Sequence, residues 1–429
     1  MTEDTAPSSY LEDAEKAEQI AARINTAYEH IQAGDQPAAL AECQAILESG
    51  DVDTMNAAKT SKLLERLGQE TAAKQVRDMI LDRLEQEIAA RPKDAGILRQ
   101  AGLVFDYFGL ETRADDFLRR ALELDPAELG PAFRLTHNLL NKGEPEAAVA
   151  LWEPVFAVYE EPGKPMLAVA KILGQFGFTD HAVAMLDRAE PLCETNRREF
   201  DFISSGIRGE RTDLDQHAMA VEVFDSFASS YDAVLERLEN NGPVMISRAL
   251  SEIGLPQDQS RDVFDAGCGT GLCAPYLRPY AKLLSGADIS AQMLNLCREK
   301  GAYDVLTRTD LSVAATYPDG KFDLVVQADV LVYFGDLRDV FTNVFSCLRP
   351  GGWFVFTVEK AGSPEPKVGY RLNASGRHEH TPGFLDEALI GAGFGKPKQI
   401  REDTLRLELG RPVSGLAVAA QKPVLAVFS

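Results

Sequence analysis

The chain has few cysteines and no long apolar run. Its 429 residues include six cysteines, none of them in a C-x-x-C pair, so neither a disulfide framework nor a paired-cysteine metal site is expected. No stretch reaches the roughly 18 apolar residues of a membrane-spanning helix. The first residues, Met1 to Asp4, lack the basic and apolar regions of a signal peptide. We therefore expect a cytoplasmic protein with reduced thiols and no membrane span.

Positive charge is also scarce. Lysine and arginine number 44 against 66 aspartates and glutamates, which gives a net charge of −22. Because phosphate contacts dominate the affinity of proteins for nucleic acids, this charge argues against a DNA or RNA substrate. The length exceeds what one hydrophobic core normally organises, so two domains are expected.

The amino-terminal half carries a repeat of turn glycines, each followed five residues later by an alanine. The glycines are Gly34, Gly68, Gly109, Gly143 and Gly177, and the alanines are Ala39, Ala73, Ala114, Ala148 and Ala182. A period of 34 residues with a turn glycine and a small residue where two helices cross is the tetratricopeptide pattern. One interval is longer by seven residues, or two helical turns, which predicts a single lengthened helix from Ala73 to Ala90.

This repeat predicts an all-α tetratricopeptide solenoid of about five helix pairs over residues 1–200. Such a stack leaves a concave groove that binds peptides or partner proteins. The alternative is a scaffold that only packs on the second domain or dimerises. Polar residues indicate a linker over 201–220, followed by a second domain over 221–429.

The second domain opens with an acidic, glycine-rich turn after a hydrophobic strand. The strand Val263 to Ala266 leads into Gly267-Cys268-Gly269-Thr270-Gly271, and Asp288 ends the next apolar run 21 residues after Gly267. This spacing places a carboxylate where a Rossmann-type βαβ unit binds a ribose. Leu272 replaces the third glycine of a dinucleotide site, and Asp265 before the turn would repel a pyrophosphate. S-adenosylmethionine, which carries a sulfonium and an ammonium but no phosphate, fits better.

From about Val221 onwards the chain resembles class I S-adenosylmethionine-dependent methyltransferases, which have a Rossmann-like seven-stranded sheet. The matching strands are Val263 to Ala266, Leu283 to Asp288, the strand ending at Thr309-Asp310-Leu311, Phe322 to Gln327, and Trp353 to Glu359. The turn Leu348-Arg349-Pro350-Gly351-Gly352 resembles the one that precedes the fifth strand in that family.

The resemblance implies a role for each residue of the cofactor site. Asp288 would bind the ribose, Ile289 and Met293 would pack on adenine, and Asp310 with the Leu311 backbone would bind the adenine amino edge. Gly267, Gly269 and Gln327 would line the methionine moiety, within a loop completed by Asp265, Cys268 and Gly271. Met293 could instead be ordinary core, and Asp310 could only cap a turn.

The methyl acceptor is less defined. Phe224 to Asp232 resembles the F-D-x-F-A-x-x-Y-D segment of methyltransferases that act on quinone precursors and carrier-protein acyl groups. In those relatives the segment folds over the cofactor, which makes Phe227 and Tyr231 lid residues; the alternative is amphipathic-helix core. Tyr231, which would also contact the cofactor, and Tyr333 are expected at an acceptor pocket.

Two histidines follow the fifth strand. His378 and His380 lie in an insertion expected near the carboxyl ends of the strands, where active sites of this fold gather, and either could be a general base. Without a third ligand nearby no metal site is expected. Both could instead be surface groups.

We therefore expect a methyltransferase whose acceptor is an oxygen of a small-molecule or carrier-bound substrate, with the repeats recognising a partner or substrate. A carboxylate or thiolate acceptor would need no base, whereas a phenol or amine would need deprotonation. The segment Gln327 to Val330 stands where amide and nucleobase N-methyltransferases have N-P-P-[YF], which argues against those reactions. The alternatives are a protein methyltransferase, a non-catalytic adaptor that binds S-adenosylmethionine, and a dinucleotide oxidoreductase, which Leu272 disfavours.

Overall fold

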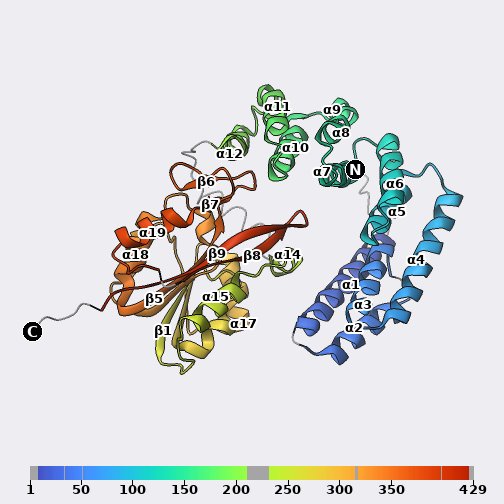
Figure 1. Cartoon of the computed structure of the whole chain (residues 1–429). Helices are drawn as coiled ribbons and strands as arrows, with labels where there is room; N and C mark the ends of the chain where they lie inside the picture. Colours follow the sequence, from blue (N-terminus) through green and yellow to red (C-terminus); the bar gives the residue numbers. More distant parts are fainter. Residues whose placement is uncertain are drawn as a thin grey trace, which may run out of the picture. The chain divides into compact units, whose positions relative to one another are not determined.

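The computed structural model describes residues 8–32, 34–50, 52–209, 231–314, 317–397 and 399–424 (Figure 1). Contacts divide the chain into two compact units, Met1–Pro165 and Met166–Ser429. Within the described ranges, no helix combines the length and the apolar character that crossing a membrane requires.

The first unit is helical. Its helices are α1 (Ser8–Gln32), α2 (Gln36–Glu48), α3 (Thr54–Arg66), α4 (Glu70–Ala90), α5 (Ala95–Tyr107), α6 (Glu111–Leu124), α7 (Leu129–Asn141), α8 (Pro145–Ala150) and α9 (Glu153–Val158). The first four turn glycines each separate two consecutive helices and have positive φ, from 72° to 77°. The four alanines that follow them are fully buried. The predicted long helix is confirmed, because α4 continues without a break to Ala90.

The division between the units differs from the expected boundary. The fifth glycine, Gly177, separates α10 (Gly163–Gln175) from α11 (Thr179–Ala189), and both helices fall almost entirely in the second unit. Residues 201–208, expected to be linker, belong to the helix α12 (Arg197–Arg208). This helix is amphipathic and buries Phe200, Ile203 and Ile207, which a linker would not do. Residues 210–220 lie outside the described ranges.

The second unit is built on one sheet of nine described strands. They are β1 (Arg261–Ala266), β2 (Ala281–Asp288), β3 (Val305–Arg308), β4 (Phe322–Gln327), β5 (Leu348–Lys360), β6 (Tyr370–Leu372), β7 (His378–His380), β8 (Gln399–Glu408) and β9 (Arg411–Gln421). Seven of them pair in the order β3-β2-β1-β4-β5-β9-β8, and the first five are parallel. The expected class, a mainly parallel Rossmann-like sheet, is confirmed.

The remaining two strands form a hairpin in the histidine insertion. β7 pairs with β5 at Glu359 and Lys360, beyond the end of β4, and β6 pairs antiparallel with β7. The third strand is shorter than expected, because it ends at Arg308 and leaves Asp310 and Leu311 in the following turn.

Helices cover both faces of the sheet, so its strands are apolar on both sides. A short 3-10 turn, η1 (Glu190–Leu192), precedes α12. The described helical segments after α12 are α14 (Tyr231–Arg237), α15 (Gly242–Glu252), α16 (Ala274–Leu277), α17 (Ala291–Lys300), α18 (Arg338–Cys347) and α19 (Pro382–Gly391), with short 3-10 turns η3 (Arg278–Tyr280) and η5 (Leu331–Tyr333). Val263 packs with α15 and α16 on one face, whereas Phe264 packs with the α18 and α19 side on the other. Because β1 to β5 are parallel, their carboxyl ends lie at the same edge of the sheet, and the glycine turn lies at this edge.

Candidate functional site

The glycine turn after β1 has a backbone that only glycine adopts easily. Gly267, Gly269 and Gly271 all have positive φ, at 91°, 53° and 92°. A Cβ on Gly267 would lie 2.3 Å from the side chain of Val330, so this position excludes any larger residue. Among the residues that the structure describes, a Cβ on Gly269 would meet Tyr231 alone, at 3.9 Å. The described residues therefore pack closely against the first glycine of the turn and leave more room at the second.

Asp288 links this turn to the end of β2. Its Oδ2 accepts a hydrogen bond of 2.9 Å from the Gly269 backbone N–H, and its Oδ1 accepts one of 2.9 Å from Ser290. A carboxylate has further lone pairs, so the same side chain that braces the turn can accept a hydroxyl from a ligand.

A cleft lies above the turn at the carboxyl edge of the sheet. Its volume is about 660 Å³, including the open mouth. It is lined by Tyr231, Gly267, Gly269, Asp288, Ile289, Met293, Asp310, Leu311, Ala328, Asp329, Val330, Tyr333 and Phe334. The structure thus brings together nine residues that sequence reasoning assigned to the site. Of the remaining assignments, Phe227 lies outside the described residues.

Asp265 was expected to face a cationic ligand, but it lies behind the turn. Its side chain is 1% exposed and does not line the cleft. It accepts a hydrogen bond of 2.5 Å from the hydroxyl of Tyr303. The pKa of Asp265 is raised to about 7, chiefly by burial and in smaller part by the charge of Asp288, while the hydrogen bond from Tyr303 opposes the rise.

Three other expected cofactor residues also pack behind the cleft wall. Cys268 lies in an apolar cluster with Leu294 and Cys297, and a Cβ on Gly271 would lie 3.1 Å from the sulfur of Cys297. Gln327 is fully buried at the end of β4, and its amide has no hydrogen-bond partner of normal geometry among the described residues. These residues shape the wall from behind.

The two histidines are neither surface groups nor part of the cleft lining. His378 is 7% exposed and His380 is fully buried. Burial lowers the pKa of His378 to about 4 and that of His380 to about 3. His380 Nε2 lies 3.0 Å from the carbonyl oxygen of Gly335, just after the turn that carries Tyr333. The structure therefore places them as supports of a cleft-lining turn. No cluster of three metal-ligating side chains occurs in the described part of the chain.

Sequence reasoning did not assign Ala328, Asp329, Val330 or Phe334, although all four line the cleft. Asp329 has a positive φ of 56°, and its backbone N–H donates to the hydroxyl of Thr357 at 2.8 Å. The sequence feature that could have predicted these four residues is their position directly after β4, because residues that follow parallel strands face the ligand site in this fold.

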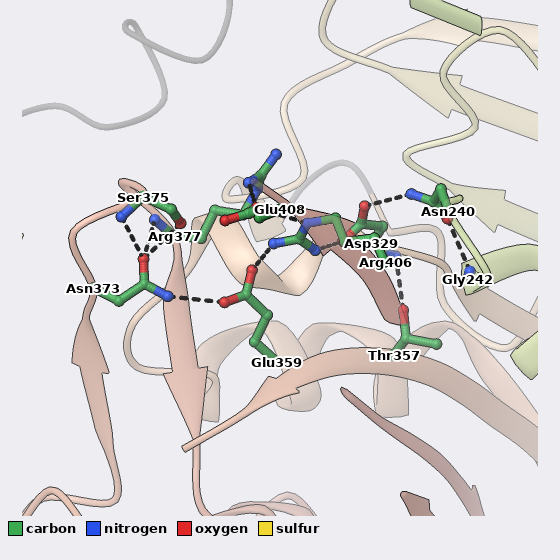
Figure 2. Close-up of polar contacts among 10 residues, drawn as sticks. All are labelled: Asn240, Gly242, Asp329, Thr357, Glu359, Asn373, Ser375, Arg377, Arg406 and Glu408. Atoms are coloured by element: carbon green, nitrogen blue, oxygen red, sulfur yellow. Dashed lines mark hydrogen bonds and ion pairs between the residues drawn. The ribbon is translucent and has the colours of Figure 1, made fainter. Parts of the chain in front are cut away.

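Behind Asp329 lies a buried charged network (Figure 2). Arg406, which is fully buried, donates to Asp329 at 3.2 Å, to Glu408 at 2.8 Å and to Glu359. Asn240 donates to the other oxygen of Asp329 at 2.9 Å. An uncompensated buried charge is costly, so this arginine and its carboxylates depend on one another and hold Asp329 at the cleft.

Tyr231 is held at the cleft by its neighbour in sequence. Asp232 accepts hydrogen bonds from the hydroxyl of Thr270 and, at 2.6 Å, from Lys300. These contacts tie the start of α14 to the glycine turn and to the end of α17. Tyr231 and Tyr333 both have a raised pKa because of burial, so their hydroxyls stay protonated at neutral pH.

The residues present fit S-adenosylmethionine. Gly267 and Gly269 present backbone to the cleft, Asp288 offers a carboxylate, and Ile289, Met293 and Leu311 offer an apolar surface. The first helix after the turn, α16, has only four residues, which is a poor site for a pyrophosphate at a helix N-terminus.

Comparison with known proteins supports this fit. Residues 264–356 match the family model described as "Methyltransferase domain". A malonyl-[acyl-carrier protein] O-methyltransferase of Enterobacter lignolyticus is 29% identical over 205 residues, which cover 47% of this chain and 78% of that protein. The enzyme of the same name from Salmonella typhimurium is 31% identical over 132 residues, 31% of this chain and only 52% of that protein. A solved S-adenosylmethionine-dependent methyltransferase from Mesorhizobium loti is 27% identical with a TM-score of 0.34, covering 41% of this chain and 96% of its own.

The second unit therefore contains a class I S-adenosylmethionine-dependent methyltransferase domain. The match covers the glycine turn, Asp288 and β4, but not the helices of the first unit. The helical half thus has no counterpart in the family match.

Proposed function

We propose that this protein methylates an oxygen, and specifically a carboxylate on an acyl group held by a carrier protein. The observation that carries the proposal is the pair of tyrosines in the cleft lining, Tyr231 and Tyr333, which we assign to the acceptor. The relatives named above act on malonyl groups of acyl-carrier proteins, according to their names.

The two tyrosines suit an acceptor that is already ionised. Their raised pKa values make them hydrogen-bond donors at neutral pH and poor proton acceptors. No histidine lies among the described residues that line the cleft. A carboxylate needs no base, whereas a phenol or an amine does. The cleft residues therefore favour an acceptor that arrives as an anion.

The reaction is a displacement at carbon. When bound, S-adenosylmethionine supplies an electrophilic methyl group on a sulfonium. The acceptor oxygen forms a C–O bond as the C–S bond breaks, and the sulfonium charge is neutralised. The residues of this chain hold the acceptor in line with the methyl group, which is the main source of rate acceleration in such a reaction. Tyr231 and Tyr333 would orient the acceptor, and Asp288 with the glycine turn would hold the cofactor.

The test is methyl transfer by the full chain to malonyl–acyl carrier protein. Mass spectrometry should find one added methyl as an ester, which mild alkali removes. Acetyl–acyl carrier protein is the matched control, because it has the same carrier and thioester but no free carboxylate. Methylation of both, or of neither, would contradict a carboxylate acceptor.

We also propose that α1 to α8 are tetratricopeptide repeats that bind the carrier or another partner protein. Their support is the regular series of turn glycines and buried alanines. The affinity of acyl carrier protein for the full chain should exceed that for a chain lacking residues 1–165. Equal affinities would place the carrier on the second unit alone.

A further inference from the structure

The tip of the β6–β7 hairpin is in close contact with α10 and α12. A Cβ on Gly206 of α12 would lie 2.5 Å from the backbone oxygen of Asn373. A Cβ on Gly174 of α10 would lie 2.9 Å from the Cβ of Ala374. Cβ atoms in proteins do not lie this close to other heavy atoms. A larger residue than glycine at either position would therefore displace the hairpin tip. All of these residues belong to the second compact unit.

The hairpin tip is itself well ordered by hydrogen bonds (Figure 2). The side-chain oxygen of Asn373 accepts from the backbone N–H and the hydroxyl of Ser375, at 2.9 and 2.6 Å, and from the Arg377 backbone at 3.3 Å. Its amide nitrogen donates to buried Glu359 at 2.8 Å. A displacement of the tip by α10 or α12 would therefore move it as one piece, with the base of β7.

The base of the hairpin supports the turn that carries Tyr333. His380 contacts the carbonyl of Gly335, and a Cβ on Gly335 would lie only 3.0 Å from His378 Nε2. Arg377 lies between the Tyr333 hydroxyl and the carboxylate of Glu408, with which it forms an ion pair. Any movement of the hairpin would be transmitted to Tyr333 through these contacts.

Charge connects the same elements. Lys171 of α10 interacts electrostatically with both Arg377 and Glu408: burial lowers the pKa of Lys171, the positive charge of Arg377 lowers it further, and the carboxylate of Glu408 opposes the fall. Glu408 forms ion pairs with both Arg377 and Arg406, and Glu359 forms a further ion pair with Arg406. The helix, the hairpin tip and the cleft wall thus share one electrostatic network.

We propose that α10 and α12, which precede the matched methyltransferase domain, position the acceptor side of the cleft by holding the hairpin tip and, through Arg377, His378 and His380, the turn with Tyr333. These helices are then a specificity-determining part of the catalytic unit rather than a spacer. The assignment of Tyr333 to the acceptor rests on the proposed function.

Gly206→Ala tests the proposal in the full chain. Alanine has a higher helix propensity than glycine, so the substitution by itself should stabilise α12. A destabilised hairpin tip would therefore result from the clash with Asn373. The control is Gly391→Ala in α19, where a Cβ would meet no atom of the described residues within 4 Å. Amide hydrogen exchange, followed by mass spectrometry, should become faster at 370–377 and also at 331–335 in Gly206→Ala, and should stay unchanged at both in Gly391→Ala.

Kinetics give the second measurement. In Gly206→Ala, kcat/KM for malonyl–acyl carrier protein should fall roughly tenfold to a hundredfold, as expected when a reacting group is misplaced by about 1 Å. The affinity for S-adenosylhomocysteine, measured by calorimetry, should stay within about twofold, because the glycine turn and Asp288 are held by hydrogen bonds to one another and to Ser290. A loss of cofactor affinity that parallels the loss of turnover would assign the contact to general stability and overturn the proposal.

Two outcomes of the exchange measurement also overturn it: faster exchange at 370–377 without a change at 331–335, and no change at either segment. Hydrogen exchange is measured without an acceptor. If the wild-type enzyme does not methylate malonyl–acyl carrier protein, the proposed function is refuted, but the exchange data still test whether α12 and the hairpin tip are coupled to the turn with Tyr333. Gly174→Ala gives the same test should Gly206→Ala not fold. Unfolding of both variants would show that the contact serves only the stability of the unit.

Discussion

The backbone N–H of Gly269 donates a hydrogen bond of 2.9 Å to the carboxylate of Asp288. The turn that would hold the methionine moiety and the residue that would hold the ribose are therefore one assembly. A substitution of Asp288 removes a ligand group and at the same time releases the turn.

Asp288→Ala should weaken binding of S-adenosylhomocysteine by roughly ten- to a hundredfold, because hydrogen bonds to a charged group contribute about 1.5 to 3 kcal/mol. Calorimetry with the full chain measures this. Asp288→Asn is the informative control, since its amide oxygen can still accept from Gly269. An affinity loss in the asparagine variant close to that of alanine would assign the effect to the lost charge, whereas wild-type affinity in both would remove Asp288 from the site.

Asp265 should make the folded state less stable as the pH rises. Its pKa is raised to about 7 in the folded state, against about 3.9 in an unfolded chain. Between these values the folded state binds a proton that the unfolded state has lost, so the free energy of unfolding falls with rising pH, by at most about 1.4 kcal/mol per pH unit, and levels off above pH 7.

Urea unfolding of Asp265→Asn beside the wild type measures this contribution. The variant should gain stability relative to the wild type between pH 4 and 7, and the difference should be constant above pH 7. Tyr303→Phe removes the hydrogen bond that stabilises the ionised form, so it should raise the pKa of Asp265 and extend the fall in stability to higher pH. A difference between Asp265→Asn and wild type that does not vary with pH would show that Asp265 ionises normally.

The expected site residues that the structure brings together at the cleft include those whose position follows from the backbone. Gly267, Gly269 and Asp288 are separated by one strand and one short connection, so their spacing alone brings them to the same edge of the sheet. The same reasoning predicted the lengthened α4, because a seven-residue insertion in a helix keeps its register.

The errors concern contacts between segments far apart in sequence. Nothing local shows that His380 would be covered by the turn after β4, or that Arg406 would be buried among carboxylates from β5 and β8. The first unit was expected to extend to residue 200, but the second compact unit begins at Met166, and within it α12 contacts both α11 and β6. A repeat pattern reports how a helix pair is built and not which neighbour buries its outer face.

The histidines should cause a loss of stability in acid. Their pKa values are lowered to about 4 and about 3 in the folded state, against about 6.5 when unfolded. As the pH falls below about 6.5, the unfolded chain gains protons that the folded chain does not, so the free energy of unfolding decreases, by at most about 1.4 kcal/mol per pH unit for each histidine.

The double variant His378→Gln/His380→Gln should be less stable than the wild type at pH 7, because Gly335 loses a partner, but its stability should change less between pH 6.5 and 4.5. Urea unfolding at several pH values measures both effects. His181→Gln in α11, outside this cluster, should keep the acid sensitivity of the wild type. Equal acid sensitivity in the double variant would mean that other groups control acid unfolding.

The tyrosines should contribute as hydrogen-bond donors and not as bases. Tyr333→Phe and Tyr231→Phe each remove one hydroxyl from the cleft, and a neutral hydrogen bond contributes about 0.5 to 1.5 kcal/mol, so kcat/KM for the acceptor should fall roughly two- to tenfold for each. Because burial holds the pKa of both tyrosines above the usual 10, kcat/KM of the wild type should be flat between pH 7 and 9. Each phenylalanine variant should show the same flat profile at a lower level. The opposite result would be a wild-type kcat/KM that rises tenfold per pH unit over this range, together with a flat profile in one of the phenylalanine variants. That result would identify the substituted tyrosine as a base and exclude an acceptor that is already ionised.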